Sequence, residues 1–128
     1  MKLKINNTEG IRETNKTKNR QLIIEAGIKV FINKGVAEAT VRDIIRSTGL
    51  ASGTFYNYFK SKEEVLVAIF DDFALEIGKN IRVDAKKPNN FEDFLREKIT
   101  RFFKFVSTRP EIYMICLLYT SDAADDTC

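Results

Sequence analysis

The sequence predicts an all-α protein in which an amino-terminal three-helix unit of the helix-turn-helix type is followed by further helices. No segment of its 128 residues alternates apolar and polar side chains with a period of two, as a half-buried strand would. Apolar residues recur instead at steps of three and four, first between residues 16 and 33 and again after residue 64. Between these stretches, residues 40–64 carry two short helical patterns joined by a glycine, and a third helix follows at once.

The first helix is predicted from about Lys16 to Asn33. Residues 1–15 are polar and aperiodic, and we expect them to form a flexible basic arm. A cation in the last turn, Lys34, and a glycine stop, Gly35, mark the end of the helix. Its predicted inward face consists of Ile23, Ala26, Gly27, Val30 and Phe31.

The helix pair is defined by its caps. Thr40 is the predicted N-cap of the first member, and Asp43 completes a capping box. Gly49 ends that helix, because a positive φ there is easy for glycine and resisted by other residues. The second member starts at Ser52 or Thr54 and runs through residue 59. The residues spaced to pack the pair together and onto the first helix are Ile44, Ile45, Leu50, Phe55 and Phe59.

Three longer helices complete the prediction. Ser61 and Glu64 form a second capping box, which opens a helix with Val65, Leu66, Ile69, Phe73 and Ile77 on one face. Asn90 caps a further helix, and Pro110 fits the first turn of the last one. From Tyr119 on, the sequence YTSDAADDTC abandons the helical pattern. We expect residues 119–128 to be a non-native tail, translated from sequencing-adapter sequence that begins as early as Cys116; the alternative is a genuine polar tail.

Charge is distributed unevenly along the chain. Residues 1–62 carry 12 Lys and Arg against five Asp and Glu, a net charge of +7, whereas residues 63–128 carry nine against 13, a net of −4. A basic half of this kind is typical of a nucleic-acid reader, although solvated surface charge can also fall this way by chance.

Composition argues against several other classes of function. The chain has no His, no nucleophile-elbow pattern and no Gly-rich phosphate loop, so nothing recommends an enzyme or a cofactor. Its two cysteines form neither a disulfide framework nor a zinc pattern, so no metal site is expected. With no apolar signal segment and no apolar run near the roughly 20 residues of a membrane helix, we expect no membrane association and a cytoplasmic location.

The second helix of the pair is unusually rich in hydrogen-bonding groups. In a helix-turn-helix unit this helix enters the major groove of DNA while the first braces it across the backbone. Gly53 would let the helix approach the backbone closely, and Arg42 and Lys62 lie at flanking helix starts that suit phosphate. The side chains left to face phosphates and base edges are Ser52, Thr54, Tyr56, Asn57 and Tyr58.

The order of these residues resembles the tetracycline-repressor (TetR) family over about residues 20–70. The match is carried by TVRDII (40–45), TGLA (48–51), GTFYNYF (53–59) and SKEEVL (61–66). The resemblance implies phosphate contacts from Thr40, Arg42, Tyr56, Tyr58 and Lys62. It also implies base or groove contacts from Ser52, Thr54 and Asn57, with Gly53 close to the backbone.

The sequence departs from the family pattern at three positions. Ala51 stands where the family usually has a capping Ser or Thr, which would leave Ser52 to cap. Ser52 itself replaces a frequently basic residue. Asn57 stands where His is common and could pair with adenine through two hydrogen bonds.

The resemblance implies a transcriptional regulator, specifically a repressor that binds a palindromic operator as a homodimer and is released by an unknown small molecule. On this reading residues 16–62 bind DNA, and residues 63–118 form a linking helix and part of a ligand-binding and dimerisation domain. The family dimerises through later helices, so we expect this chain to be truncated, to bind operator weakly and to associate through exposed apolar surface. The alternative is a helical protein-interaction module whose helix-turn-helix unit binds a protein.

The aromatic stripe after Asn90 has two interpretations. A helical spacing of phenylalanines favours plain core packing. By resemblance, the same stripe would line an effector pocket through Phe94, Phe102 and Phe103.

Overall fold

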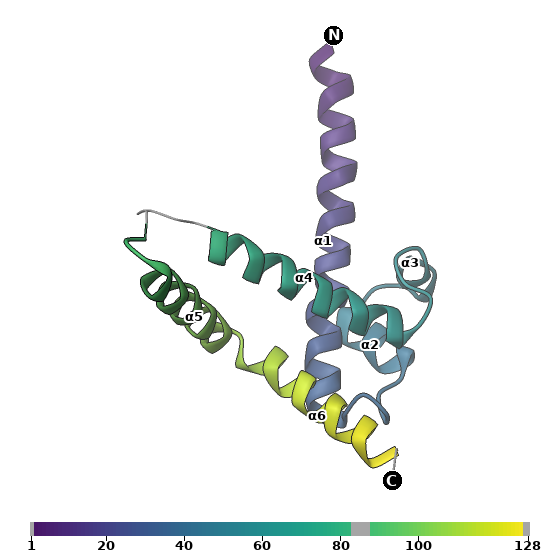
Figure 1. The fold of residues 1–128 in the computed structure, drawn as a ribbon. Helices are drawn as coiled ribbons and strands as arrows, with labels where there is room; N and C mark the ends of the chain where they lie inside the picture. Colours follow the sequence, from purple (N-terminus) through teal and green to yellow (C-terminus); the bar gives the residue numbers. More distant parts are fainter. Residues whose placement is uncertain (1, 83–87, 127–128) are drawn as a thin grey trace. The chain divides into compact units, whose positions relative to one another are not determined.

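The computed structural model describes residues 2–82 and 88–126, with side chains over residues 10–82 and 88–119. Within these residues the chain forms helices and no strand, which confirms the all-α prediction (Figure 1). The order is α1 (Lys2–Lys34), α2 (Val41–Thr48), α3 (Ser52–Tyr56), α4 (Lys62–Arg82), α5 (Phe91–Thr108) and α6 (Pro110–Asp126). The chain divides into two compact units, Met1–Leu66 and Val67–Cys128.

Helix α1 starts earlier than predicted. It begins at Lys2, so the expected start near Lys16 was wrong, and the segment expected to form an arm is helical. Residues 10–18 of the helix are exposed, and periodicity detects only packed turns. Packing begins at Ile23, and from there the predicted face is buried through Phe31. The predicted stop is confirmed, since Gly35 has a φ of 81° and its N–H donates to the Phe31 carbonyl at 2.8 Å.

Helix α2 is capped at both ends as predicted. Thr40 Oγ1 accepts from the Asp43 N–H, and Asp43 Oδ2 accepts from the Thr40 N–H, each at 3.1 Å. Gly49 ends the helix with a φ of 74°. Ile44, on the inward face of α2, is fully buried and the helix packs against α1. Ile45 and Leu50, which were also predicted to pack the pair together, are partly buried.

Helix α3 is a short element of five residues, and hydrogen-bonded turns continue it to Phe59. Its anchors are Phe55, which is fully buried, and Phe59. The next helix, α4, begins where Ser61 Oγ accepts from the Glu64 N–H at 3.2 Å, while the Glu64 carboxylate accepts from the Lys60 N–H at 2.8 Å. The Ser61 cap is therefore confirmed, with the return bond shifted by one residue.

The second unit holds α5, α6 and most of α4. Asn90 caps α5 by accepting from the Asp93 N–H at 2.8 Å, and Pro110 is the first residue of α6, both as predicted. Lys98 and Arg101 of α5 donate to the Ile81 and Asn80 carbonyls in the last turn of α4. Cations from α5 therefore satisfy the carbonyl end of α4.

Two predictions for the second unit were wrong. Helix α6 continues to Asp126, through the segment that was expected to leave the helical pattern, and Cys128 lies outside the described residues. No described residue of α5 is buried, so the stripe does not form the expected core, and Phe94, Phe102 and Phe103 are 39%, 38% and 62% exposed. Across residues 2–82 and 88–126, no helix is long and apolar enough to cross a membrane.

Candidate nucleic-acid interface

Helix α3 presents one packed side and one polar side. Phe55 is buried and its ring meets the Tyr56 ring edge-on, with the ring centroids 5.3 Å apart. Tyr56 is itself 54% exposed, which leaves its hydroxyl in solvent. Five polar side chains of this segment make no hydrogen bond with any other described residue, namely Ser52, Thr54, Tyr56, Asn57 and Tyr58. Their donors and acceptors are therefore available to an external partner.

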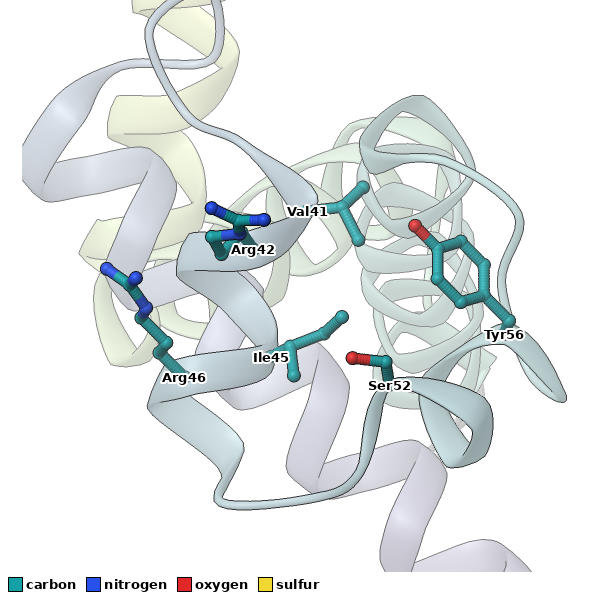
Figure 2. A pocket seen from close by; sticks show the side chains of 6 residues that line it. All are labelled: Val41, Arg42, Ile45, Arg46, Ser52 and Tyr56. Carbon is teal, nitrogen blue, oxygen red and sulfur yellow. The ribbon is translucent and has the colours of Figure 1, made fainter.

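An open hollow of about 350 Å³ separates α2 from α3 (Figure 2). Val41 and Ile45 of α2 supply its apolar lining. Ile45 is only half-buried because it borders this open hollow. Ser52 and Tyr56 line the α3 side, and Figure 2 shows the Tyr56 hydroxyl directed toward Val41. The hollow combines apolar surface with two hydroxyl groups.

Two arginines add charge beside the hollow. Arg42 and Arg46 lie one turn apart on α2, are exposed and have no acidic partner among the described residues. Both arginines line the hollow together with Val41, Ile45, Ser52 and Tyr56 (Figure 2). The sequence prediction included Arg42 and missed Arg46, although four-residue spacing places the two on one helix face and could have identified it.

The start of α2 is fixed by a charge pair beneath Thr40. Asp43 Oδ1 accepts from Lys34 Nζ at 3.0 Å, and its other oxygen holds the Thr40 N–H. The Lys34 ammonium and the bonds from Thr40 lower the pKa of the Asp43 carboxyl. The Thr40 hydroxyl oxygen accepts the cap bond, so its O–H remains free to donate outward.

Comparison with known proteins identifies the unit. Residues 23–69 match the sequence model of the family described as "Bacterial regulatory proteins, tetR family". This segment, less than half of the chain, is similar to the tetR family. The chain is similar to the uncharacterized HTH-type transcriptional regulator YvdT of Bacillus subtilis (strain 168), with 30% identity over 94 residues, 73% of this chain and 48% of YvdT. The fatty acid metabolism regulator protein of the same organism is 28% identical over 85 residues, 66% of this chain and 44% of that protein.

Solved tetR-family structures show the same fold. The crystal structure of a TetR-family regulator from Syntrophomonas wolfei matches with a TM-score of 0.68 and 30% identity, over 78% of this chain and 52% of that one. The fatty acid degradation regulator FadR from Bacillus halodurans matches with a TM-score of 0.71 and 27% identity, over 82% and 56%. The chain thus spans about half the length of the relatives that it matches.

Helix α3 has no side-chain cap. Ala51 is the N-cap of α3 and supplies no side-chain hydrogen bond, and Ser52 is already the first helical residue. The expectation that Ser52 takes over the cap was therefore wrong. Its hydroxyl is left for an external partner instead.

Gly53 is not required by the fold. Its φ is not positive, and apart from its chain neighbours and its own helical backbone, a Cβ built on it would meet no described atom within 4 Å. Glycine in an exposed helical turn is less favourable than alanine by about 0.5–1 kcal/mol. Neither backbone conformation nor packing against the described residues therefore explains a glycine at this position.

Lys62 has partners within the protein. Its ammonium donates to the carbonyls of Val36, Ala37 and Ala39 at 2.8, 3.0 and 2.9 Å. The structure thus brings the other predicted contact residues onto the surface of α2 and α3, and gives the Lys62 ammonium a set of internal acceptors.

Proposed function

We propose that residues 16–62 bind double-stranded DNA, with α3 in the major groove, and that the protein is a sequence-specific transcriptional regulator. One observation carries the proposal: five polar side chains of one short segment make no hydrogen bond with the described residues. Two of them, Ser52 and Tyr56, line a hollow with Arg42 and Arg46, which have no acidic partner among those residues. A helix that served only packing would not leave so many donors and acceptors unused. Similarity to a family of bacterial regulators supports the same conclusion.

The proposed contacts divide by chemistry. Arg42 and Arg46 approach phosphates, because unpaired guanidinium groups bind phosphate oxygens through two hydrogen bonds. Thr40, Tyr56 and Tyr58 donate hydroxyl hydrogens to the same backbone. Base edges are read by Ser52, Thr54 and Asn57, and Gly53 allows the groove wall to approach. The hollow between α2 and α3 receives a sugar-phosphate segment on its apolar and hydroxyl-bearing surfaces.

The regulatory role that we propose is that of a repressor released by a small molecule. We propose a repressor that binds a palindromic operator as a homodimer, because a two-fold pair of recognition helices matches two half-sites one helical turn apart. Release would come from a small apolar effector bound by residues 63–118, where Phe94, Phe102 and Phe103 expose ring surface. Two similar proteins are named as fatty acid regulators, which makes long-chain acyl compounds the first effectors to screen. We also propose a cytoplasmic location, since that is where a bacterial operator would be bound.

The test measures DNA affinity against salt concentration. A duplex is first selected from a random-sequence pool by the unmodified chain, and its affinity is then followed by fluorescence anisotropy. Each phosphate contact contributes about 0.9 to the slope of log K against log salt. Arg42→Gln and Arg46→Gln should each lower the slope by about one. Arg82→Gln, an exposed arginine of the second unit, serves as the control and should leave the slope unchanged.

Two results would reject the proposal. The first is failure to enrich any duplex. The second is capture of a protein partner with an affinity that does not depend on salt, which would favour the protein-interaction module.

A further inference from the structure

The Lys62 side chain makes three hydrogen bonds within the amino-terminal unit. Its Nζ donates to Val36 O at 2.8 Å, Ala37 O at 3.0 Å and Ala39 O at 2.9 Å, and the first and last of these bonds are partly buried. An ammonium group has three donors. All three are therefore used by backbone carbonyls, and none remains for a phosphate in this arrangement.

These bonds connect two segments that flank the helix pair. The three carbonyls belong to the turn between α1 and α2, while Lys62 is the first residue of α4. The bonded residues are 23 to 26 positions apart in sequence. The contact therefore closes a loop that contains all of α2 and α3, and it fastens that loop at its base.

Electrostatics explains why the Lys62 side chain points toward these carbonyls and away from the start of its own helix. A lysine in the first turn of a helix lies near the positive end of the helix dipole, where cations are disfavoured. The carbonyls of residues 36, 37 and 39 lie in the turn just after the carboxyl end of α1, where the helix dipole is negative and a cation is favoured. Glu63 and Glu64 occupy the first turn of α4 with the favoured sign of charge.

We propose that Lys62 is a positioning residue that holds α2 and α3 in the geometry needed for groove entry, and that it is not a phosphate ligand. The proposal rests on the proposed DNA-binding function. Removing the ammonium would leave both ends of the helix pair less restrained. Lys60 offers a matched control, because its side chain is exposed and makes no hydrogen bond in the described part of the chain.

The first experiment needs no DNA. Lys62→Met and Lys60→Met each remove one charge and keep an apolar stem, and hydrogen exchange is measured at the amides of α2 in both full-length chains. The Ile44 N–H, which donates to Thr40 O at 3.3 Å, reports on the helix start beside the contact. We expect exchange about tenfold faster than in the unmodified chain for Lys62→Met and unchanged exchange for Lys60→Met. Equal exchange in the two variants would overturn the proposal.

The second experiment separates positioning from phosphate binding. Affinity is measured for the selected duplex and for a duplex of unrelated sequence over a range of salt. For Lys62→Met we expect about a tenfold or larger loss on the selected duplex, a smaller loss on the unrelated one, and an unchanged salt slope. A phosphate ligand would weaken both duplexes alike and lower the slope by about one, and that result would overturn the proposal.

A third variant, Lys62→Arg, separates position from charge. A guanidinium keeps the positive charge but holds its donors in a planar fork, which does not match three carbonyls that converge on one nitrogen. We expect amide exchange in α2 to stay fast in Lys62→Arg. If Lys62→Arg restored the slow exchange of the unmodified chain, the role of the three-carbonyl contact would be overturned. If the unmodified chain binds no duplex, the proposed function fails, while the exchange comparison still decides the role of Lys62.

Discussion

Gly53→Ala should separate what α3 needs for folding from what it needs for DNA. Apart from its chain neighbours and its own helical backbone, the added methyl group meets no described atom within 4 Å, and φ at this position is not positive. The substitution should therefore stabilise the folded chain by about 0.4–1 kcal/mol, by restricting the unfolded state. For a domain of this size, 1 kcal/mol raises Tm by roughly 4–8 °C, so we expect a rise of a few degrees.

The same methyl group should weaken DNA binding. If the backbone of α3 lies against a phosphate or sugar, the extra carbon overpacks that contact, at a cost of about 1–3 kcal/mol. Since about 1.4 kcal/mol corresponds to a factor of ten, affinity for the selected duplex should fall by at least about fivefold. Circular dichroism gives Tm, and fluorescence anisotropy gives the affinity.

Gly78→Ala is the matched control for this substitution. Gly78 lies within α4, and a Cβ there also meets no atom within 4 Å. It should raise Tm by a similar amount and leave DNA affinity unchanged. A lower Tm for Gly53→Ala would show that the fold itself uses the glycine. A higher Tm with unchanged affinity would show that DNA does not approach the backbone at this position.

Further predictions concern the start of α2 and one thiol. Thr40→Ala removes the N-cap and should lower the free energy of unfolding by about 1 kcal/mol in urea titration, whereas Thr40→Ser should keep most of it. Because Lys34 lowers the pKa of Asp43 in the folded chain, this pair stabilises the protein above the ordinary value of 3.8, and the stabilisation is lost as pH falls below it. Asp43→Asn should therefore make the urea midpoint less dependent on pH between 5 and 3, and an unchanged dependence would contradict the pair. Burial raises the pKa of the Cys116 thiol, so in a Cys128→Ser background iodoacetamide should label Cys116 more slowly at pH 8.5 in the folded chain than in urea.

The sequence predicted the local features of the fold well. The caps at Thr40, Ser61 and Asn90, and the glycine stops at Gly35 and Gly49, are confirmed because each depends on a few neighbouring residues. Boundaries at the ends of the chain were less accurate. Helices α1 and α6 extend beyond their packed turns, and hydrophobic periodicity gives no signal where a helix does not pack.

Features that depend on distant residues could not be predicted. The half-burial of Ile45 follows from the hollow between two helices, which the pattern of α2 alone does not contain. The three carbonyls that accept from Lys62 lie 23 to 26 residues away in the sequence. The sequence around a lysine that follows a cap residue does not show whether its ammonium binds backbone carbonyls or phosphates. The contact set on α3 remains a prediction, since it depends on a partner.

The composition of α3 explains why its surroundings matter for recognition. A helix of five residues is far below the roughly 12–15 that an isolated helix needs, and this one also lacks a side-chain cap and contains a glycine. Full burial of Phe55 contributes about 1.5–3 kcal/mol, which exceeds the ~1 kcal/mol that a cap would add. The recognition segment is therefore held by its aromatic anchors and by the segments at its base, and its own backbone contributes little. Its polar face stays exposed because packing is confined to the opposite side, so its orientation depends on the restraints at the base of the helix pair.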